Sequence, residues 1–569
     1  MIHILQSLIN NIVVLPFFVA LVTALVGIMW RLPGSGRRLF FSVSASIQVI
    51  LACFIIFLTH KVKILFLPVG AWKAPFGISI TIDIFGSLLI GITTLLSLFA
   101  ILYLFATLKK SKENPLLLPL IQFMIAGIIL SFSTGDFFNL FVSFEIFLIA
   151  SYGLLTLKSD ESSIKNAFPY LGINVIGGTL FVLGASFVYG MYGTLNFADI
   201  SAQTSHLAQD PKLILIASYL VLVFGIKAGF FPLFYWLPRS YSCLPAPVAA
   251  LFAGLLTKVG IYAIIRTLTT IFPLGLVSIY SAIGYLSIFT MVVAIIISLS
   301  RSNIREILCY NLISHIGFLM AAIAIFSPIS LTGGIFYMMH HMVVIASLFL
   351  ISGLVIQITK TDVLKDSGNV WKHHGFVGVL FLVQALSLAG LPPFSGFWGK
   401  FLILREAIRF DQVSVAAAII LASILTLLSM IRIWFHVFLK KNDGLKMGSV
   451  PKGFKRSTTV VSILVLFSLI MGIFSNPFIS ASNKAMSLLL NKSRYENKVL
   501  SYEQTLKMET DSHSSHSEND AHSKDVTKKD TNHHMESNHD THKEVKHSSK
   551  HFKLESISKK EVSNGSSVH

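Results

Sequence analysis

The feature that most constrains this chain is a succession of long apolar segments that carry almost no charge. Fourteen of them follow one another, near residues 8–30, 39–59, 83–107, 115–134, 136–157, 164–190, 212–236, 244–268, 274–299, 304–327, 331–358, 373–404, 412–439 and 457–480. A helix needs about 20 mostly apolar residues to cross a bilayer. Charged residues make up 13% of the chain, against about 25% in soluble domains. We therefore predict an all-α polytopic membrane protein with about 14 transmembrane helices.

The basic residues of the loops predict how the chain is oriented. The loops after odd-numbered segments hold 20 Lys and Arg residues, and those after even-numbered segments hold 7. Cytoplasmic loops carry the excess of Lys and Arg in membrane proteins. We therefore expect a multi-pass protein of the cell membrane with both termini outside the cytoplasm. The net charge of +18 then reflects topology and not a nucleic-acid surface.

Residues 61–81, in an outer loop, have the Pro and Gly spacing of a short hairpin or an extended cover.

A few ionisable residues stand inside the apolar segments: Lys227, Lys258, Lys400, Arg432 and Glu145. A charged side chain at membrane depth costs about 3 kcal/mol or more, so such residues usually serve transport. Two alternatives remain: the lysines reach an interface with their charged ends, or Glu145 is a neutral, hydrogen-bonded packing residue. An arginine keeps its charge, so we expect Arg432 to be a structural or gating charge.

Two of the predicted spans are interrupted close to a lysine. Pro232 follows Lys227 by five residues, and Pro392 and Pro393 precede Lys400. Proline breaks a helix, and the freed carbonyls are expected beside the ammonium groups. Broken helices at the membrane midplane are typical of ion sites in secondary transporters, where they recur in the two halves of an internal repeat.

Three histidines in the tenth and eleventh spans are candidate proton carriers: His315, His340 and His341. Neighbouring residues of a helix diverge by about 100°, so we expect at most one of His340 and His341 to face a shared path. The alternative is that each histidine is a hydrogen-bonding packing residue. Neither these histidines nor the three cysteines have the spacing of a metal site.

The segment 484–569 is polar and contains ten of the 19 histidines, which predicts disorder. Its pairs His513 and His516, and His539 and His542, have a spacing that allows loose binding of Zn²⁺ or Cu²⁺. The alternative is a solvated appendage or a weak pH-responsive brush. No firm metal site is predicted.

Four long motifs connect these residues to a known family: LPAPVAALFAGLLTKVGIYAIIR, GIKAGFFPLFYWLP, NLFVSFEIFLIASYGL and LAGLPPFSGFWGKF. Over about residues 80–440 the chain resembles the proton-translocating antiporter-like family that respiratory complex I shares with Mrp-type Na⁺/H⁺ antiporters, and it looks most like the D-type members of the latter. The resemblance implies two inverted five-helix repeats, each with a broken helix. The implied parts are an N-terminal three-helix segment 1–110, a first repeat 111–270, a second repeat 271–440, a last helix 441–483 and the tail 484–569.

The resemblance also implies roles for single residues. Glu145 and Lys227 would be the charged pair of the first half, Lys258 the connecting lysine and Lys400 the terminal lysine of the second half. The sequence departs from the family pattern at two places. Ile345 stands where a lysine is common, and Asn311 stands where a histidine is common.

Together these features predict a proton-translocating subunit of a multisubunit monovalent cation (Na⁺)/proton antiporter. It would be a secondary transporter subunit and not an enzyme, with no cofactor, no catalytic residue and no nucleic-acid partner. The expected partners are the other antiporter subunits, Na⁺, H⁺ and the lipid bilayer. One alternative is a proton-pumping subunit of a respiratory NADH dehydrogenase or a membrane-bound hydrogenase, although no flavin, quinone or iron–sulfur motif is present. Another is a purely structural assembly subunit.

Overall fold

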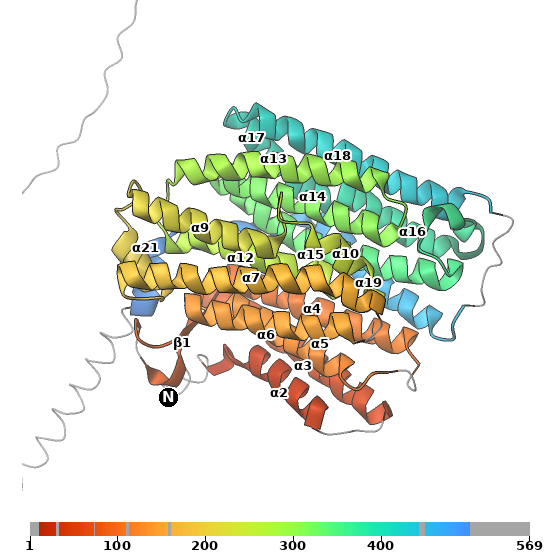
Figure 1. The fold of residues 1–569 in the computed structure, drawn as a ribbon, viewed down its shortest axis with the longest axis horizontal. Helices are drawn as coiled ribbons and strands as arrows, with labels where there is room; N and C mark the ends of the chain where they lie inside the picture. The colour runs from red at the N-terminus through yellow and green to blue at the C-terminus, as the bar shows by residue number, and fades with distance from the viewer. Residues whose placement is uncertain are drawn as a thin grey trace, which may run out of the picture. The chain divides into compact units, whose positions relative to one another are not determined.

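The computed structural model describes residues 11–29, 34–72, 74–109, 113–157, 161–442 and 450–500 of the 569. In that part the long helices run side by side, from α2 and α3 at the bottom of Figure 1 to α17 and α18 at its top. The elements in chain order are α2 (Leu15–Met29), α3 (Gly34–Val62), β1 (Ile64–Pro68), η1 (Val69–Ala71), β2 (Ser79–Asp83), α4 (Ile84–Thr107), α5 (Leu117–Ser133), α6 (Phe137–Thr156), α7 (Glu161–Tyr192), α8 (Phe197–Thr204), α9 (Pro211–Ala228), α10 (Trp236–Ser242), α11 (Ala246–Leu251), η3 (Phe252–Leu256), α12 (Thr257–Arg266), η4 (Thr267–Ile271), α13 (Val277–Ser300), α14 (Ile304–Ile325), α15 (Pro328–Thr359), η5 (Leu364–Asp366), α16 (Val370–Ala389), α17 (Ser395–Arg409), α18 (Val413–Ile433), η6 (Trp434–Leu439), α19 (Phe454–Ile473), α20 (Ser475–Leu490) and α21 (Lys492–Leu500).

The all-α membrane architecture is confirmed. Twelve helices of the described residues are long and apolar enough to cross a membrane, and α2 and α5 are shorter apolar helices. Each of the fourteen predicted segments overlaps one of these helices. Helices α19 and α20 return to pack on α4 and α15. The division into inverted repeats stays a prediction.

Both predicted helix breaks are present, and they share one cap geometry. α9 ends at Gly229 and α16 ends at Gly390, with φ angles of 75° and 89°. This left-handed backbone region is one that glycine occupies without strain. The next residue in each case donates its N–H back across the cap, from Phe230 to the carbonyl of Gly225 and from Leu391 to that of Leu386. Each helix therefore ends before its proline, at a glycine that stands three residues ahead of Pro232 or Pro393.

The hairpin expected in residues 61–81 is also confirmed. Strands β1 and β2 pair antiparallel, with Ile64 opposite Asp83 and Pro68 opposite Ser79. The predicted start of the tail at residue 484 differs from the structure, because α20 continues through it and α21 follows. Tyr495 and Val499 of α21 are buried. Apolar residues at helical spacing thus anchor a segment whose average composition is polar.

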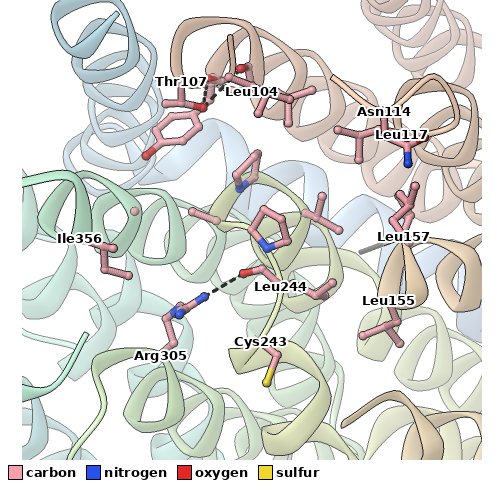
Figure 2. A pocket seen from close by; sticks show the side chains of 18 of the residues that line it. Leu104, Thr107, Asn114, Leu117, Leu155, Leu157, Cys243, Leu244, Arg305 and Ile356 are labelled. Carbon is pink, nitrogen blue, oxygen red and sulfur yellow. Dashed lines mark hydrogen bonds between the residues drawn. The ribbon is translucent and has the colours of Figure 1, made fainter. Parts of the chain in front are cut away.

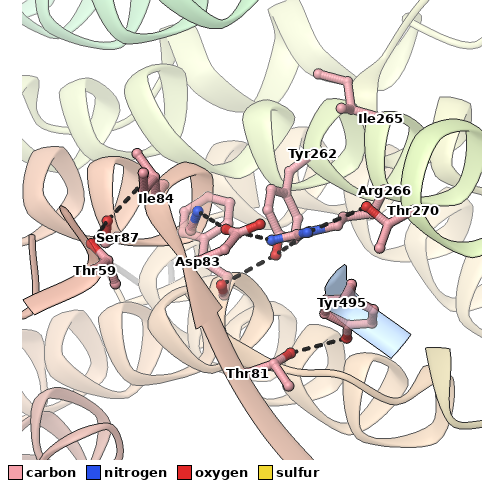
Figure 3. Close-up of polar contacts among 12 residues, drawn as sticks. Thr59, Thr81, Asp83, Ile84, Ser87, Tyr262, Ile265, Arg266, Thr270 and Tyr495 are labelled. Carbon is pink, nitrogen blue, oxygen red and sulfur yellow. Dashed lines mark hydrogen bonds and ion pairs between the residues drawn. The ribbon is translucent and has the colours of Figure 1, made fainter. Parts of the chain in front are cut away.

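A buried ion pair lies beneath α21 and joins distant parts of the chain (Figure 3). Nη2 of Arg266 lies 2.7 Å from Oδ1 of Asp83, and both side chains are at most 5% exposed. Arg266 also donates from Nε to the hydroxyl of Tyr262, while the hydroxyls of Tyr495 and Thr81 are 3.2 Å apart. Both residues lie at the ends of apolar segments, and they are buried because α12 continues through η4 and α21 covers the pair.

Candidate functional site

The first cluster of the site consists of Glu145 on α6 and Lys227 on α9, with a glycine pair of α7 packed against both. Lys227 is 4% exposed. A methyl group at Gly177 would lie 3.5 Å from its Nζ, and one at Gly178 would lie 2.7 Å from Oε1 of Glu145. A methyl group at Gly178 would therefore displace the carboxylate of Glu145, whereas one at Gly177 would make ordinary contact with Lys227.

The contacts of Lys227 differ from the expected ones in one respect. Its Nζ donates to the carbonyl of Asn174 on α7, at 2.9 Å. The carbonyl beside the ammonium therefore comes from a neighbouring helix and not from the broken span. Among the described residues Glu145 and Lys227 form no ion pair within 4.0 Å. Glu145 instead lines a pocket of about 500 Å³ between α6 and α7.

Lys258 lies at the centre of the described bundle and is fully buried. Its Nζ donates to the carbonyl of Ala253, five residues earlier, at 2.6 Å. That carbonyl belongs to η3, one turn of π-helix between α11 and α12. π-Helical turns leave the normal hydrogen-bond ladder and are frequent at functional sites. Here the turn supplies the acceptor that holds the ammonium of Lys258.

Lys400 has the surroundings that the sequence predicted, because the broken span supplies its acceptors. Its Nζ donates to the carbonyls of Leu388 and Ala389, both at 3.0 Å, where α16 ends. The Nζ also lies 4.5 Å from the ring centre of Phe318. A cation held by carbonyls and an aromatic face is stabilised without an opposite charge. The side chain is 5% exposed.

The three histidines lie in one cluster next to Lys400. Nε2 of His315 is 3.2 Å from the carbonyl oxygen of Leu388, the same carbonyl that Lys400 contacts. The rings of His315 and His341 are stacked with centres 5.2 Å apart. Nδ1 of His340 is 2.7 Å from Oγ of Ser395, the first residue of α17. His341 therefore faces α14, and His340 faces the first turn of α17. That at most one of them faces a shared path stays a prediction.

Tyr337 and Glu406 belong to this region and were missed from the sequence. The ring of Tyr337 stacks near His315 and His341, at centre distances of 6.1 and 6.2 Å. Its position one turn before His340 was the available signal. Glu406 is 1% exposed. It was missed because the twelfth span was expected to end at residue 404, whereas α17 continues to Arg409.

The remaining predicted residues have structural contacts. Nη1 of Arg432 donates to the carbonyl of Leu299 in the last turn of α13, which caps that helix. Asn311 donates to the hydroxyls of Ser298 and Ser429, at 2.9 and 3.1 Å. Ile345 is fully buried in the apolar core. The tail histidines His513, His516, His539 and His542 lie outside the described residues.

A pocket of about 530 Å³ opens at the helix ends that carry the basic loops. Figure 2 shows Arg305 donating to the carbonyl of Leu244 next to Cys243, at 2.9 Å. Pro245 and Ala246, which begin α11, also line the pocket. It therefore lies at the start of the helix that continues to Lys258.

Comparisons with known proteins support one family. Residues 133–426 match the family described as NADH:quinone oxidoreductase/Mrp antiporter, TM. The chain is 35% identical to the D subunit of the Na⁺/H⁺ antiporter of Bacillus subtilis (strain 168), over 86% of this chain and 99% of the relative. It is 34% identical to the protein of the same name from Alkalihalophilus pseudofirmus, over the same shares.

Solved structures agree in fold. The chain resembles a subunit in the structure of the Mrp complex from Dietzia sp. DQ12-45-1b, with 26% identity, a TM-score of 0.79, and coverage of 87% of this chain and 99% of that one. Respiratory complex I from Thermus thermophilus contains the same fold, with 22% identity, a TM-score of 0.73, and coverage of 84% and 99%. The chain therefore belongs to the NADH:quinone oxidoreductase/Mrp antiporter membrane family, in the group of Na⁺/H⁺ antiporter D subunits.

Proposed function

We propose that this chain is the proton-translocating subunit of a multisubunit Na⁺/H⁺ antiporter of the cell membrane. One observation carries the proposal: Lys227, Lys258 and Lys400 are all buried, and each donates to main-chain carbonyls. A hydrogen bond from an ammonium group to a neutral carbonyl is weaker than one to a carboxylate. The carbonyl therefore positions the ammonium group and still allows it to release its proton. The names of the relatives favour this function over the respiratory alternative.

The proposed path follows the ionisable groups in order. Glu145 stabilises the ammonium of Lys227 from across the glycine pair, and its protonation or movement removes that stabilisation and releases a proton. The proton passes through water to Lys258 and then to the histidine cluster. The carbonyl of Leu388, shared by His315 and Lys400, connects the cluster to the terminal lysine.

The orientation of the chain is part of the proposal. With both termini outside the cytoplasm, the pocket beside Cys243 and Arg305 opens to the cytoplasm and takes up protons. Lys400 then lies on the way to the outer surface. The other antiporter subunits are the proposed partners, and Na⁺ is the proposed counter-ion.

Glu145→Ala and Lys227→Ala test the function in inverted membrane vesicles that contain the whole complex. We expect both variants to lose Na⁺-driven proton movement, measured with a pH-sensitive dye. Lys212→Ala is the matched control, because Lys212 is exposed at the start of the same helix α9. Full activity in both site variants would exclude the proposed path.

A further inference from the structure

One buried carboxylate, Glu406, has no part in the path described so far. Its Oε2 accepts a hydrogen bond from the hydroxyl of Ser327, at 2.7 Å, and within the described residues its Oε1 accepts none. Arg405 and Arg409 place guanidinium nitrogens 4.0 and 3.9 Å from Oε1, and both arginines are more than half exposed. Glu406 is therefore a buried acid in electrostatic contact with two groups that reach the surface.

The packing of α15 on α17 connects Glu406 with the histidine cluster. A methyl group at Gly399 would lie 2.8 Å from Cβ of Tyr337, and one at Gly333 would lie 2.8 Å from Cβ of Leu402. Ser327 then meets Glu406 at the far end of the same interface. The two helices are thus antiparallel and in close contact from the cluster to Glu406.

Lys400 and Glu406 belong to the same buried face of α17, with Ile403 between them. The rise of 1.5 Å per residue puts Glu406 about 9 Å along the helix from Lys400. Helical side chains lean towards the helix N-terminus, so the carboxylate leans towards Lys400. Ser327 also caps α15 by accepting from the N–H of Ser330. Glu406 therefore lies at the positive end of a long helix dipole.

We propose that Glu406 receives the proton from Lys400 and releases it at the extracytoplasmic surface. The inference rests on the proposed function and its orientation. The ammonium of Lys400 gives one proton, through water, to the carboxylate of Glu406, which leaves a neutral amine and a neutral carboxyl group. The carboxyl group then loses the proton to outside water. The groups that face Glu406 are Ser327 from α15 and Arg405 and Arg409 from its own helix, and all three stabilise the carboxylate that remains.

Glu406→Gln isolates the proton-carrying role, because the amide oxygen still accepts from Ser327 while the side chain cannot titrate. In inverted vesicles containing the complex, we expect the initial rate of Na⁺-driven proton movement to fall at least about tenfold. Asp411→Asn removes an exposed carboxylate at the same end of the helix and should keep the full rate. A normal rate in Glu406→Gln, or an equal fall in the control, overturns the inference.

Two further measurements keep the outcomes distinct. If Glu145→Ala and Lys227→Ala are inactive while Glu406→Gln is active, the role of Glu406 alone is wrong; if the first two are active, the proposed function fails with it. Should Glu406→Gln not assemble, the wild-type complex can be treated with dicyclohexylcarbodiimide, which modifies protonated carboxyl groups in apolar surroundings. Mass spectrometry should then find the modification on Glu406 at acidic pH and not on Asp411, and an unmodified Glu406 overturns the inference.

Discussion

At the scale of residues, the geometry of the first cluster depends on a missing side chain. Gly178 lies so close to Glu145 that a methyl group would stand 2.7 Å from its carboxylate oxygen. The carboxylate is the flexible end of a long side chain, so it would move aside at little cost in stability. Alanine also favours the helix over glycine by about 0.5–1 kcal/mol.

We therefore predict that Gly178→Ala lowers transport without lowering the amount of folded complex. Displacement of a reacting group by a fraction of an ångström should reduce the initial rate about tenfold, measured as Na⁺-driven proton movement in inverted vesicles. Gly172→Ala and Gly190→Ala in the same helix α7 are matched controls, because a methyl group at either place meets nothing within 4 Å. The interpretation fails if all three variants transport alike.

At the scale of elements, the junction between α10 and α11 forms one wall of the pocket proposed to take up protons. Cys243 caps α10, is exposed and lines this pocket. A membrane-impermeant, positively charged thiol reagent attached there should block the opening and repel protons. We predict inhibition in inverted vesicles, where the cytoplasmic face is outside, and none in right-side-out vesicles.

Cys243→Ser supplies the control for this experiment, because it removes the thiol and keeps a small polar side chain. Cys309 is buried, and Cys53 lies within the apolar helix α3, so neither should react with a reagent confined to water. Inhibition that persists in Cys243→Ser, or that occurs only in right-side-out vesicles, would contradict the proposed pocket or the proposed orientation.

At the scale of the whole molecule, the Asp83–Arg266 pair joins the hairpin, α4 and α12, and α21 covers it. Asp83→Asn keeps an oxygen to cap α4 but leaves the arginine buried without an opposite charge. We expect a loss of about 3–5 kcal/mol of stability, seen as a lower unfolding temperature of the purified complex. Glu161→Gln breaks an exposed pair with Lys165, whose side chains are 83% and 75% exposed, and should leave the unfolding temperature unchanged.

The sequence by itself determined the membrane class, the apolar helical segments and the three buried lysines, Lys227, Lys258 and Lys400. The hydrocarbon core contains no water, so the backbone N–H and C=O groups must form their hydrogen bonds within each helix. The length and composition of the apolar segments therefore predict these features directly. Glu145, Lys227, Lys258 and Lys400 stood out for the same reason, since a charge in an apolar run is visible without any neighbour.

Only the tertiary structure decided which groups meet. The carbonyl of Asn174 beside Lys227, the stacking of His341 on His315 and the contact of Ser327 with Glu406 all join different helices. Such contacts depend on how the helices rotate and pack against one another. The 3.6-residue period of one helix shows which of its faces is apolar, but it does not show which helix packs there or in what rotation. The burial of Asp83 and Arg266 under α21 was hidden for the same reason: a charge near the end of an apolar segment is exposed or enclosed according to what the rest of the chain places over it.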